Sequence, residues 1–467
     1  MTMQTFERRE SDVRGYSRTY PVVFDKALNA RQTDENGKEY IDFFAGAGVL
    51  NFGHNNERMQ KAVIEYIQSN GVTHSLDMAT VAKRAFIEKF EDVVLKPRNM
   101  PHKMQFMGPT GTNSVEAALK IARRVTGRQH IVSFSHGFHG MTLGSLACTA
   151  NAYFRGAAGV PLQHVTHQAF GCETPCRGCT LGCGDESVDR MRALYADTSS
   201  GVAPPAAFLV ETIQAEGGVK VASAQWLMQL QALAKEVGAL LIVDDIQVGC
   251  GRTGSYFSFD EFGLDPDIVC LAKGVGGWGT PMALNLVKPE IDKYWAPGEH
   301  TGTFRGQNLS FVAGREALTY FENDELMLEV KRKAKVMHTA MQTLVKRHPA
   351  LELTGKGMIL GLNVGGTELS KSIVNQCFKN GLMIASCGTG GRVIKLIPPL
   401  TIPDTDLNEG LNILTKAVDM AMEAVDSNGL MPMRAVPKVH PTAYAFRRAL
   451  QTALPAHLAH RPLPDPL

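Results

Sequence analysis

The feature that most constrains the fold is a regular alternation of short apolar runs with helical patterns. Between the runs, apolar residues recur at helical spacing, as at Val115, Leu119 and Ala122, and Gly238 would end the helix that contains Trp226. This alternation predicts an α/β fold with a mostly parallel sheet covered by helices on both faces. The strand-like runs are residues 104–107, 131–134, 207–210, 239–243, 268–271 and 282–287.

The pattern changes after about residue 325. A long amphipathic helix is predicted from there to about residue 348, then strand-like pieces at 358–364 and 393–397, and a last helix that places Leu414 and Val418 on one face. With 467 residues the chain should divide into more than one domain. We expect a large domain (56–325), a smaller α+β domain (326–427) joined by the N-terminal segment (1–55), and a loosely packed tail (428–467).

The charge balance and hydropathy exclude several functions. The chain has 48 basic and 46 acidic residues and no basic stripe, so nucleic acid is not an expected partner. The first residues are charged throughout, and no apolar run reaches the roughly 18 residues of a membrane span. We therefore expect a cytoplasmic protein without a membrane partner, whose nine cysteines are mostly thiols.

Two of the apolar runs end in residues suited to one cofactor. Lys273 follows one run and precedes Gly274, and a lysine in such a place can form a Schiff base with an aldehyde. Asp244 closes another run, where a carboxylate can hold a pyridinium nitrogen. Taken alone, Lys273 is more typical of a solvated strand end and Asp244 of a helix cap or turn. Together they suggest pyridoxal phosphate.

A phosphate site is indicated upstream, where residues 106–116 have the pattern of a strand, a glycine turn and a helix start. Asn113 and Glu116 have the spacing of an N-cap with its reciprocal partner, which would leave the amides of Gly111 and Thr112 free for an anion. An ordinary capped helix is the alternative. Farther along, Phe138 offers an aromatic face for a pyridine ring.

These motifs resemble those of the class III, or ω-amino acid, aminotransferases, which are pyridoxal phosphate enzymes of fold type I. The resemblance covers about residues 37–425, and the order of the motifs is the family's order. The matching segments are Thr110-Gly111-Thr112, Phe138-His139-Gly140, residues 211–218, 244–249, 272–274 and 300–308.

The resemblance implies a role for each matching residue. Lys273 would hold the cofactor and move a proton, Asp244 would keep the ring nitrogen protonated, and Gln247 would lie beside the phenolic oxygen. Ile246 would pack opposite Phe138, and Thr303 of the partner subunit would reach the phosphate, so a homodimer or higher homo-oligomer is implied. The cofactor site is thus expected at Thr110, Gly111, Thr112, Phe138, His139, Asp244, Ile246, Gln247, Lys273 and Thr303.

Three residues bear on the substrates, an amino acid and an oxo acid. In the family, a glutamate at the position of Glu216 pairs with an arginine and swings aside to admit an α-carboxylate; here the arginine position is Lys395, which lacks the planar fork. Arg305 stands where the family usually has glycine, and it would either bind a carboxylate or form a surface salt bridge.

These departures, with residues 43–48, 73–78 and 298–306, resemble the diaminobutyrate–2-oxoglutarate transaminases. Such enzymes exchange an amino group between L-glutamate and L-aspartate 4-semialdehyde. The alternatives are an aminotransferase for another ω-amino acid, of the ornithine or 4-aminobutyrate type, and an aminomutase, racemase or decarboxylase on the same scaffold. A metal-linked interaction protein with a degenerate enzyme fold is an alternative of another class.

A cysteine cluster stands apart from these motifs. Cys172, Cys176, Cys179 and Cys183 could enclose zinc or an iron–sulfur cluster, or they could be reduced thiols in a polar loop. No metal ligand is predicted in the active site, because the cofactor already supplies the electron sink. The other cysteines are predicted to lie in the core: Cys148, Cys250, Cys270, Cys377 and Cys387.

Overall fold

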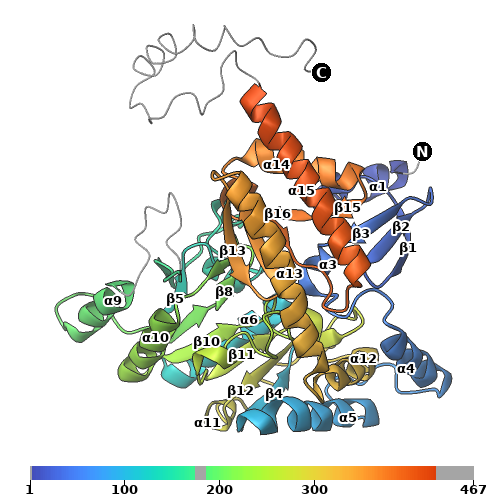
Figure 1. Ribbon diagram of the computed structural model, residues 1–467. Coiled ribbons are helices and arrows are strands. Elements are labelled where there is room, and N and C mark those ends of the chain that lie inside the picture. Colours follow the sequence, from blue (N-terminus) through green and yellow to red (C-terminus); the bar gives the residue numbers. More distant parts are fainter. Residues whose placement is uncertain (1–2, 174–185, 428–467) are drawn as a thin grey trace, which may run out of the picture.

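The computed structural model describes residues 3–173 and 186–427 (Figure 1), and its largest sheet has seven strands among those residues. Only β12 runs antiparallel to its neighbours, so the predicted mostly parallel sheet is confirmed. In spatial order the strands are β4 (Lys103–Phe106), β12 (Leu284–Val287), β11 (Ile268–Leu271), β10 (Leu240–Asp244), β7 (Ala207–Val210), β5 (Ile131–Phe134) and β6 (Val165–Gln168).

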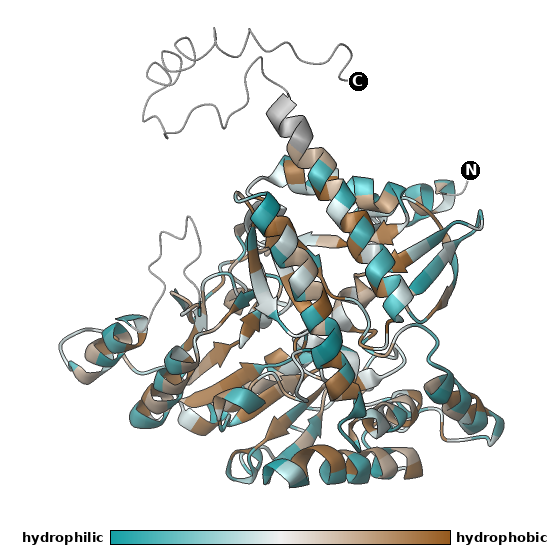
Figure 2. Ribbon diagram, viewed as in Figure 1, coloured by the Kyte–Doolittle hydropathy of each residue, from teal (hydrophilic) through white to brown (hydrophobic). Residues whose placement is uncertain are grey.

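Helices bury both faces of this sheet. Ile242 of β10 belongs to the apolar cluster of helix α6 (Gly111–Thr126), whereas its neighbours Leu241 and Val243 belong to the cluster of α10 (Ala224–Val237). A central strand with two buried faces therefore reads as a continuous apolar run. Figure 2 shows these strands as largely hydrophobic.

The strand β6 was not predicted. Its sequence, Val-Thr-His-Gln, has no apolar run, and none of its four residues is fully buried. It lies at the edge of the sheet, where it pairs only with β5. An edge strand needs less apolar surface, so hydropathy alone does not reveal it.

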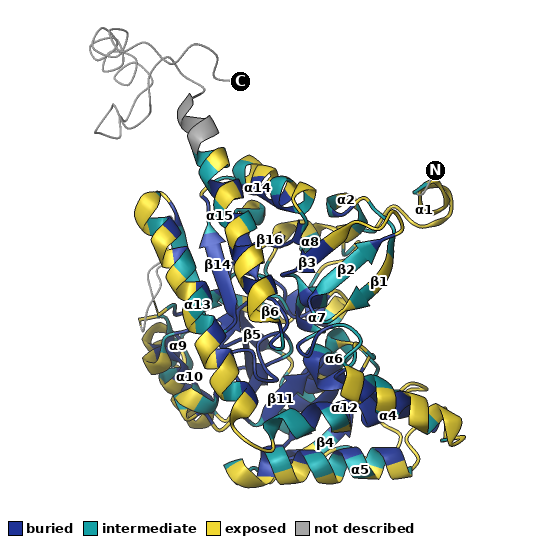
Figure 3. Ribbon diagram, turned by 45° about the vertical axis from the view of Figure 1, so that its right-hand side comes forward, coloured by how far each residue is buried: buried dark blue, intermediate teal, exposed yellow. Residues whose placement is uncertain are grey.

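A second set of elements packs above the sheet. The two long helices predicted for the C-terminal region are α13 (Glu325–Arg347) and α15 (Asp404–Ser427); they lie side by side and expose their outer faces (Figure 3). A second sheet has the order β13 (Glu352–Lys356), β14 (Ile359–Asn363), β17 (Val393–Leu396) and β16 (Ala385–Cys387), with α14 (Thr367–Lys379) beside it.

The N-terminal segment packs with these C-terminal elements. Strand β3 (Glu39–Asp42) pairs in parallel with β15 (Leu382–Met383), and Phe43 shares an apolar cluster with Met337 and Leu414. The limits of the domains remain a prediction, and the tail at 428–467 lies outside the described residues. The other main elements are β1 (Phe24–Leu28), β2 (Arg31–Asp34), β8 (Ile213–Gln214), β9 (Lys220–Val221), α1 (Gln4–Arg9), α2 (Tyr16–Thr19), α3 (Ala45–Gly48), α4 (Glu57–Gln68), α5 (Val81–Phe90), α7 (Leu143–Cys148), α8 (Ala152–Gly156), α9 (Glu186–Ala196), α11 (Pro289–Asp292) and α12 (Asn308–Leu318).

The structure also bears on the membrane and cysteine predictions. No helix within residues 3–173 and 186–427 is long and apolar enough to cross a membrane. The five cysteines predicted to be in the core are all buried. Of the cysteine cluster only Cys172 is described, so the metal hypothesis falls outside the described residues.

Candidate active site

One pocket collects most of the predicted site residues at the carboxyl ends of the parallel strands. Asp244 ends β10, and Lys273 follows β11, so the two side chains meet at the same edge of the sheet. The pocket is lined by Gly111, Thr112, Phe138, His139, Gly140, Glu211, Glu216, Asp244, Ile246, Gln247 and Lys273.

Lys273 occupies an unusual position just after its strand. Its φ of 53° is left-handed, a conformation that non-glycine residues adopt mainly where the surroundings impose it. Burial lowers the pKa of Lys273 to about 8, although the nearby Glu216 acts in the opposite direction. Near neutral pH the neutral fraction of this amine is therefore much larger than that of an ordinary lysine, which suits a nucleophile and a proton acceptor.

Asp244 is held in place from two sides. One carboxylate oxygen lies 2.8 Å from Nδ1 of the buried His139, and the other accepts the Ile246 amide at 3.2 Å. Burial lowers the pKa of His139, but the hydrogen bond and charge of Asp244 outweigh it and raise the pKa overall. His139 therefore supports the Asp244 carboxylate in addition to lining the pocket.

The turn before α6 differs from the prediction at its cap. The helix begins at Gly111 with extended Thr110 as its N-cap, and the Asn113 side chain accepts the Thr110 amide at 3.2 Å, so Asn113 is the reciprocal partner rather than the cap. Glu116 instead accepts the Ser145 amide at 3.0 Å. The prediction placed the N-cap three positions too far along the chain, because Asn113 and Glu116 have the same spacing as Thr110 and Asn113.

The first turn of α6 still offers the free amides that the predicted anion site requires. The amides of Gly111 and Thr112 belong to the first turn of α6 and have no partner within the helix. A Cβ atom at Gly111 would lie 3.0 Å from the Ile246 side chain, so glycine keeps this end of the pocket open. The Thr112 hydroxyl lies 2.6 Å from those of Thr142 and Ser145, two residues that the sequence patterns had not indicated.

Lys395 and Glu216 form an ion pair at the pocket. The Lys395 ammonium contacts the Glu216 carboxylate and lies 3.3 Å from Oε1 of Gln247, whose amide nitrogen donates to the Ala47 carbonyl at 2.7 Å. The Lys395 side chain is 1% exposed and that of Glu216 28%. Burial alone would lower the pKa of Lys395, but the charge of Glu216 has the larger effect, and the pKa of Lys395 is raised. Burial alone would raise the pKa of Glu216, but the charges of Lys395 and Lys273 have the larger effect, and the pKa of Glu216 is lowered. Both groups are therefore charged.

Glu211 also lines the pocket, and the sequence patterns do not indicate a role for it. It is buried, and its Oε2 accepts the Phe138 amide at 3.1 Å. Burial raises the pKa of Glu211 to about 8, and the negative charge of Asp244 adds to the rise. Its place at the end of β7 was the available signal, because the neighbouring parallel strands also end at the pocket.

Four predicted residues are not among those that line the pocket. Thr110 forms the helix cap, and Lys395 reaches the pocket through Glu216. Thr303 is exposed, and its carbonyl lies 2.9 Å from His74 Nε2. Arg305 donates to the carbonyl of Phe106, at the end of β4. Neither Thr303 nor Arg305 therefore lines the Lys273 pocket of its own chain.

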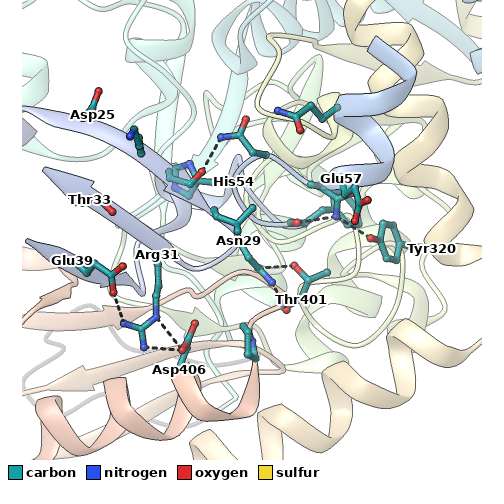
Figure 4. A pocket seen from close by; sticks show the side chains of 18 residues that line it. Asp25, Asn29, Arg31, Thr33, Glu39, His54, Glu57, Tyr320, Thr401 and Asp406 are labelled. Atoms are coloured by element: carbon teal, nitrogen blue, oxygen red, sulfur yellow. Dashed lines mark hydrogen bonds and ion pairs between the residues drawn. The ribbon is translucent and has the colours of Figure 1, made fainter. Parts of the chain in front are cut away.

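A larger groove elsewhere contains none of the predicted site residues (Figure 4). Its volume is about 1000 Å³ against about 140 Å³ for the Lys273 pocket. In the groove Arg31 is paired with Asp406 at 2.9 Å and with Glu39 at 3.3 Å. The smaller pocket, with a lysine of lowered pKa beside an acidic residue, is therefore the better candidate for chemistry.

Comparison with known proteins agrees with this geometry. The model of the family described as "Aminotransferase class-III" matches residues 14–418. The chain belongs to the class III aminotransferase family. A relative from Oceanobacillus iheyensis, named diaminobutyrate–2-oxoglutarate transaminase, is 46% identical over 90% of this chain and 97% of its own length. One of the same name from Bordetella parapertussis is 48% identical over 90% and 96%.

Solved structures also resemble this class III aminotransferase. The ornithine aminotransferase of Toxoplasma gondii, in a structure that reports partial occupancy of pyridoxal phosphate at the active site, has a TM-score of 0.77 at 25% identity. The match covers 90% of this chain and 94% of that one. The fold is that of the fold type I pyridoxal phosphate aminotransferases, as predicted.

Class III aminotransferases use pyridoxal phosphate, and the pocket residues fit that group. Lys273 offers an amine to its aldehyde, and Asp244 a carboxylate to its ring nitrogen. The start of α6 at Gly111 offers unpaired amides to its phosphate. Phe138 and Ile246 supply apolar surface for the ring.

Proposed function

We propose that this aminotransferase transfers an amino group between L-glutamate and L-aspartate 4-semialdehyde, giving 2-oxoglutarate and L-2,4-diaminobutyrate. The names of relatives that match nearly the whole chain support this choice. The structural observation that carries it is the Glu216–Lys395 ion pair at the pocket of Lys273. A movable carboxylate beside a buried cation suits two substrates of which only one places an α-carboxylate next to the reacting amine.

Lys273 is assigned the proton transfer. Pyridoxal phosphate, when bound, withdraws electrons from the carbon that carries the amino group. The lowered pKa of Lys273, about 8, lets its amine accept the proton from that carbon and deliver it to C4′ of the cofactor.

Asp244 is assigned the task of keeping a proton on the pyridine nitrogen. Its carboxylate lies 2.8 Å from Nδ1 of His139, which limits its movement. We further assign phosphate binding to the amides of Gly111 and Thr112, with Thr110 as the cap that shapes the turn. Phe138 is assigned to the ring.

Glu216 and Lys395 are assigned the choice between the two amino donors. With the pair closed, the pocket accepts the 4-amino end of diaminobutyrate, which carries no carboxylate next to the amine. When glutamate enters, Glu216 turns away and the Lys395 ammonium binds the α-carboxylate in its place. Gln247, anchored on the Ala47 carbonyl, keeps Lys395 oriented in both states.

We also propose a cytoplasmic homodimer or higher homo-oligomer in which Thr303 reaches the phosphate site of the partner subunit. Large apolar side chains around the Thr303 loop are exposed in the single chain, which favours a protein interface there. They are Val72, Leu76, Met78, Val81 and Phe304.

The proposal is tested by offering 2-oxoglutarate with one amino donor at a time and measuring the glutamate formed. Diaminobutyrate should give the highest kcat/KM, above ornithine and 4-aminobutyrate. A higher value for either of the other two would replace the substrate assignment but keep the aminotransferase. If no donor gives glutamate while diaminobutyrate is isomerised or loses CO₂, an aminomutase or decarboxylase replaces it.

A further inference from the structure

Arg305 makes one contact that neither carboxylate recognition nor a surface salt bridge accounts for, a hydrogen bond to the backbone. Its Nε donates to the Phe106 carbonyl at 3.1 Å, and Nη1 lies 3.9 Å from the Asp77 carboxylate. The Arg305 side chain is 19% exposed, whereas that of Asp77 is 62% exposed. The hydrogen bond to the backbone is thus the better-protected contact, and the ion pair is the weaker one.

The Phe106 carbonyl lies where β4 ends and the phosphate turn begins. Phe106 is the last residue of β4, opposite Leu284 of β12, and the turn that follows it leads into α6 at Gly111. Lys83 lies over the Phe106 ring, 5.4 Å from its centroid, and donates to the Asp77 carbonyl at 3.0 Å. Arg305 therefore connects its own loop to the strand that carries the phosphate turn.

The same loop is fixed on both sides of Thr303. The His300 ring stacks on Trp295 with centroids 4.8 Å apart, and Lys120 of α6 donates to the Glu299 carbonyl at 2.8 Å. His74 holds the Thr303 carbonyl at 2.9 Å. Thr303 is exposed between these anchors.

We propose that Arg305 is a positioning residue that fixes the Thr303 loop to the end of β4. It thereby holds the phosphate turn of its own subunit in a fixed position relative to Thr303, which contacts the phosphate site of the partner subunit. This rests on the proposed dimer. Arg305 acts through Phe106 and Thr303 and touches neither substrate nor cofactor. Its loss should weaken cofactor retention and leave substrate carboxylate recognition intact.

The test uses purified holoenzyme and follows the release of pyridoxal phosphate after dilution, together with KM for glutamate and for 2-oxoglutarate. Arg305→Ala should release the cofactor about tenfold faster, as expected for one lost hydrogen bond from a charged group, with both KM values unchanged. Arg305→Lys should restore part of the retention. Arg84→Ala, an exposed arginine 4.0 Å from Glu88, is the matched control and should change neither quantity.

Two outcomes would overturn the assignment. A higher KM for both carboxylate substrates with unchanged release would make Arg305 a carboxylate ligand, and no change in either quantity would make it a surface residue. Thr303→Ala separates the positioning role of Arg305 from the proposed contact of Thr303 with the partner subunit. If Thr303→Ala speeds release and Arg305→Ala does not, only the positioning role fails; if Thr303→Ala has no effect, the cross-subunit contact itself is wrong.

Discussion

The Glu216–Lys395 ion pair leads to a prediction with a calculable size. Lys395→Met keeps the length of the side chain and removes the charge that would bind the α-carboxylate of glutamate. A hydrogen bond between charged groups contributes about 1.5–3 kcal/mol, which corresponds to a loss of about 10- to 150-fold in kcat/KM for glutamate. L-2,4-diaminobutyrate should lose little, because the carbon that bears its reacting 4-amino group carries no carboxylate for Lys395 to bind.

The same variant also has a stability cost, which must be separated from the effect on specificity. Removing one partner of a buried ion pair costs about 3–5 kcal/mol, and the 28% exposure of the Glu216 side chain reduces this to roughly 1–3 kcal/mol. Lys333→Met is the matched control: Lys333 is 7% exposed, lies on α13 and donates to the Leu400 carbonyl at 3.2 Å.

The assay compares the two donors in both variants by steady-state kinetics, with thermal unfolding measured alongside. Lys395→Met should lower kcat/KM for glutamate alone. Lys333→Met should lower the melting temperature without changing the ratio of the kcat/KM values for the two donors. Equal losses for both donors in Lys395→Met, or no loss for glutamate, would refute the role of Lys395 as carboxylate receptor.

Four further predictions follow from individual contacts. Asp244→Asn should lower kcat on the order of 10²- to 10³-fold while the protein stays folded, because the charge that holds the ring proton is lost; near-normal turnover by product assay would exclude this role. Because burial lowers the pKa of Lys273 to about 8, stopped-flow absorbance should show the cofactor attaching to the apoprotein faster as the pH rises toward about 8 and levelling off above it, and a flat profile would contradict the assignment. Glu211 keeps its proton up to about pH 8 in the folded state but only up to about pH 4.5 in the unfolded state, so the apoprotein loses stability as the pH rises across that range. In urea unfolding, the free energy of unfolding of Glu211→Gln should therefore rise relative to that of the wild type by at most about 1.4 kcal/mol per pH unit across that range. A difference that does not change with pH would count against the raised pKa. Gly140→Ala should weaken cofactor binding and stability, since its φ is 126° and a Cβ would lie 2.5 Å from the Thr112 hydroxyl, whereas Gly156→Ala, with open space around it, should not; equal calorimetric melting temperatures and equal cofactor affinities would show that the position tolerates a side chain.

The central sheet was predictable because its strands are buried on two faces. Continuous apolar runs identify β10 and β11, and Lys273 and Asp244 could be located from the ends of those runs. Edge strand β6 carries no such signal, because solvent on one side relaxes the requirement for apolar residues.

Contacts between distant segments were beyond the reach of sequence patterns. Asp244 and His139 are 105 positions apart, and no pattern indicated their contact; the pairing of Glu216 with Lys395, 179 positions apart, was expected only through the family resemblance. The N-cap at Thr110 was missed for a different reason: Asn113 is itself a strong capping residue, and only the extended backbone of Thr110 decides between them.

The most direct test of the proposed reaction follows labelled nitrogen. Glutamate carrying an isotopic label in its amino group is incubated with aspartate 4-semialdehyde and the holoenzyme, and the products are identified by mass spectrometry. The label should appear in the 4-amino group of diaminobutyrate, with one 2-oxoglutarate formed for each transfer, and Lys273→Ala should abolish it. Failure of the wild-type enzyme to transfer label, or equal transfer by Lys273→Ala, would contradict the account.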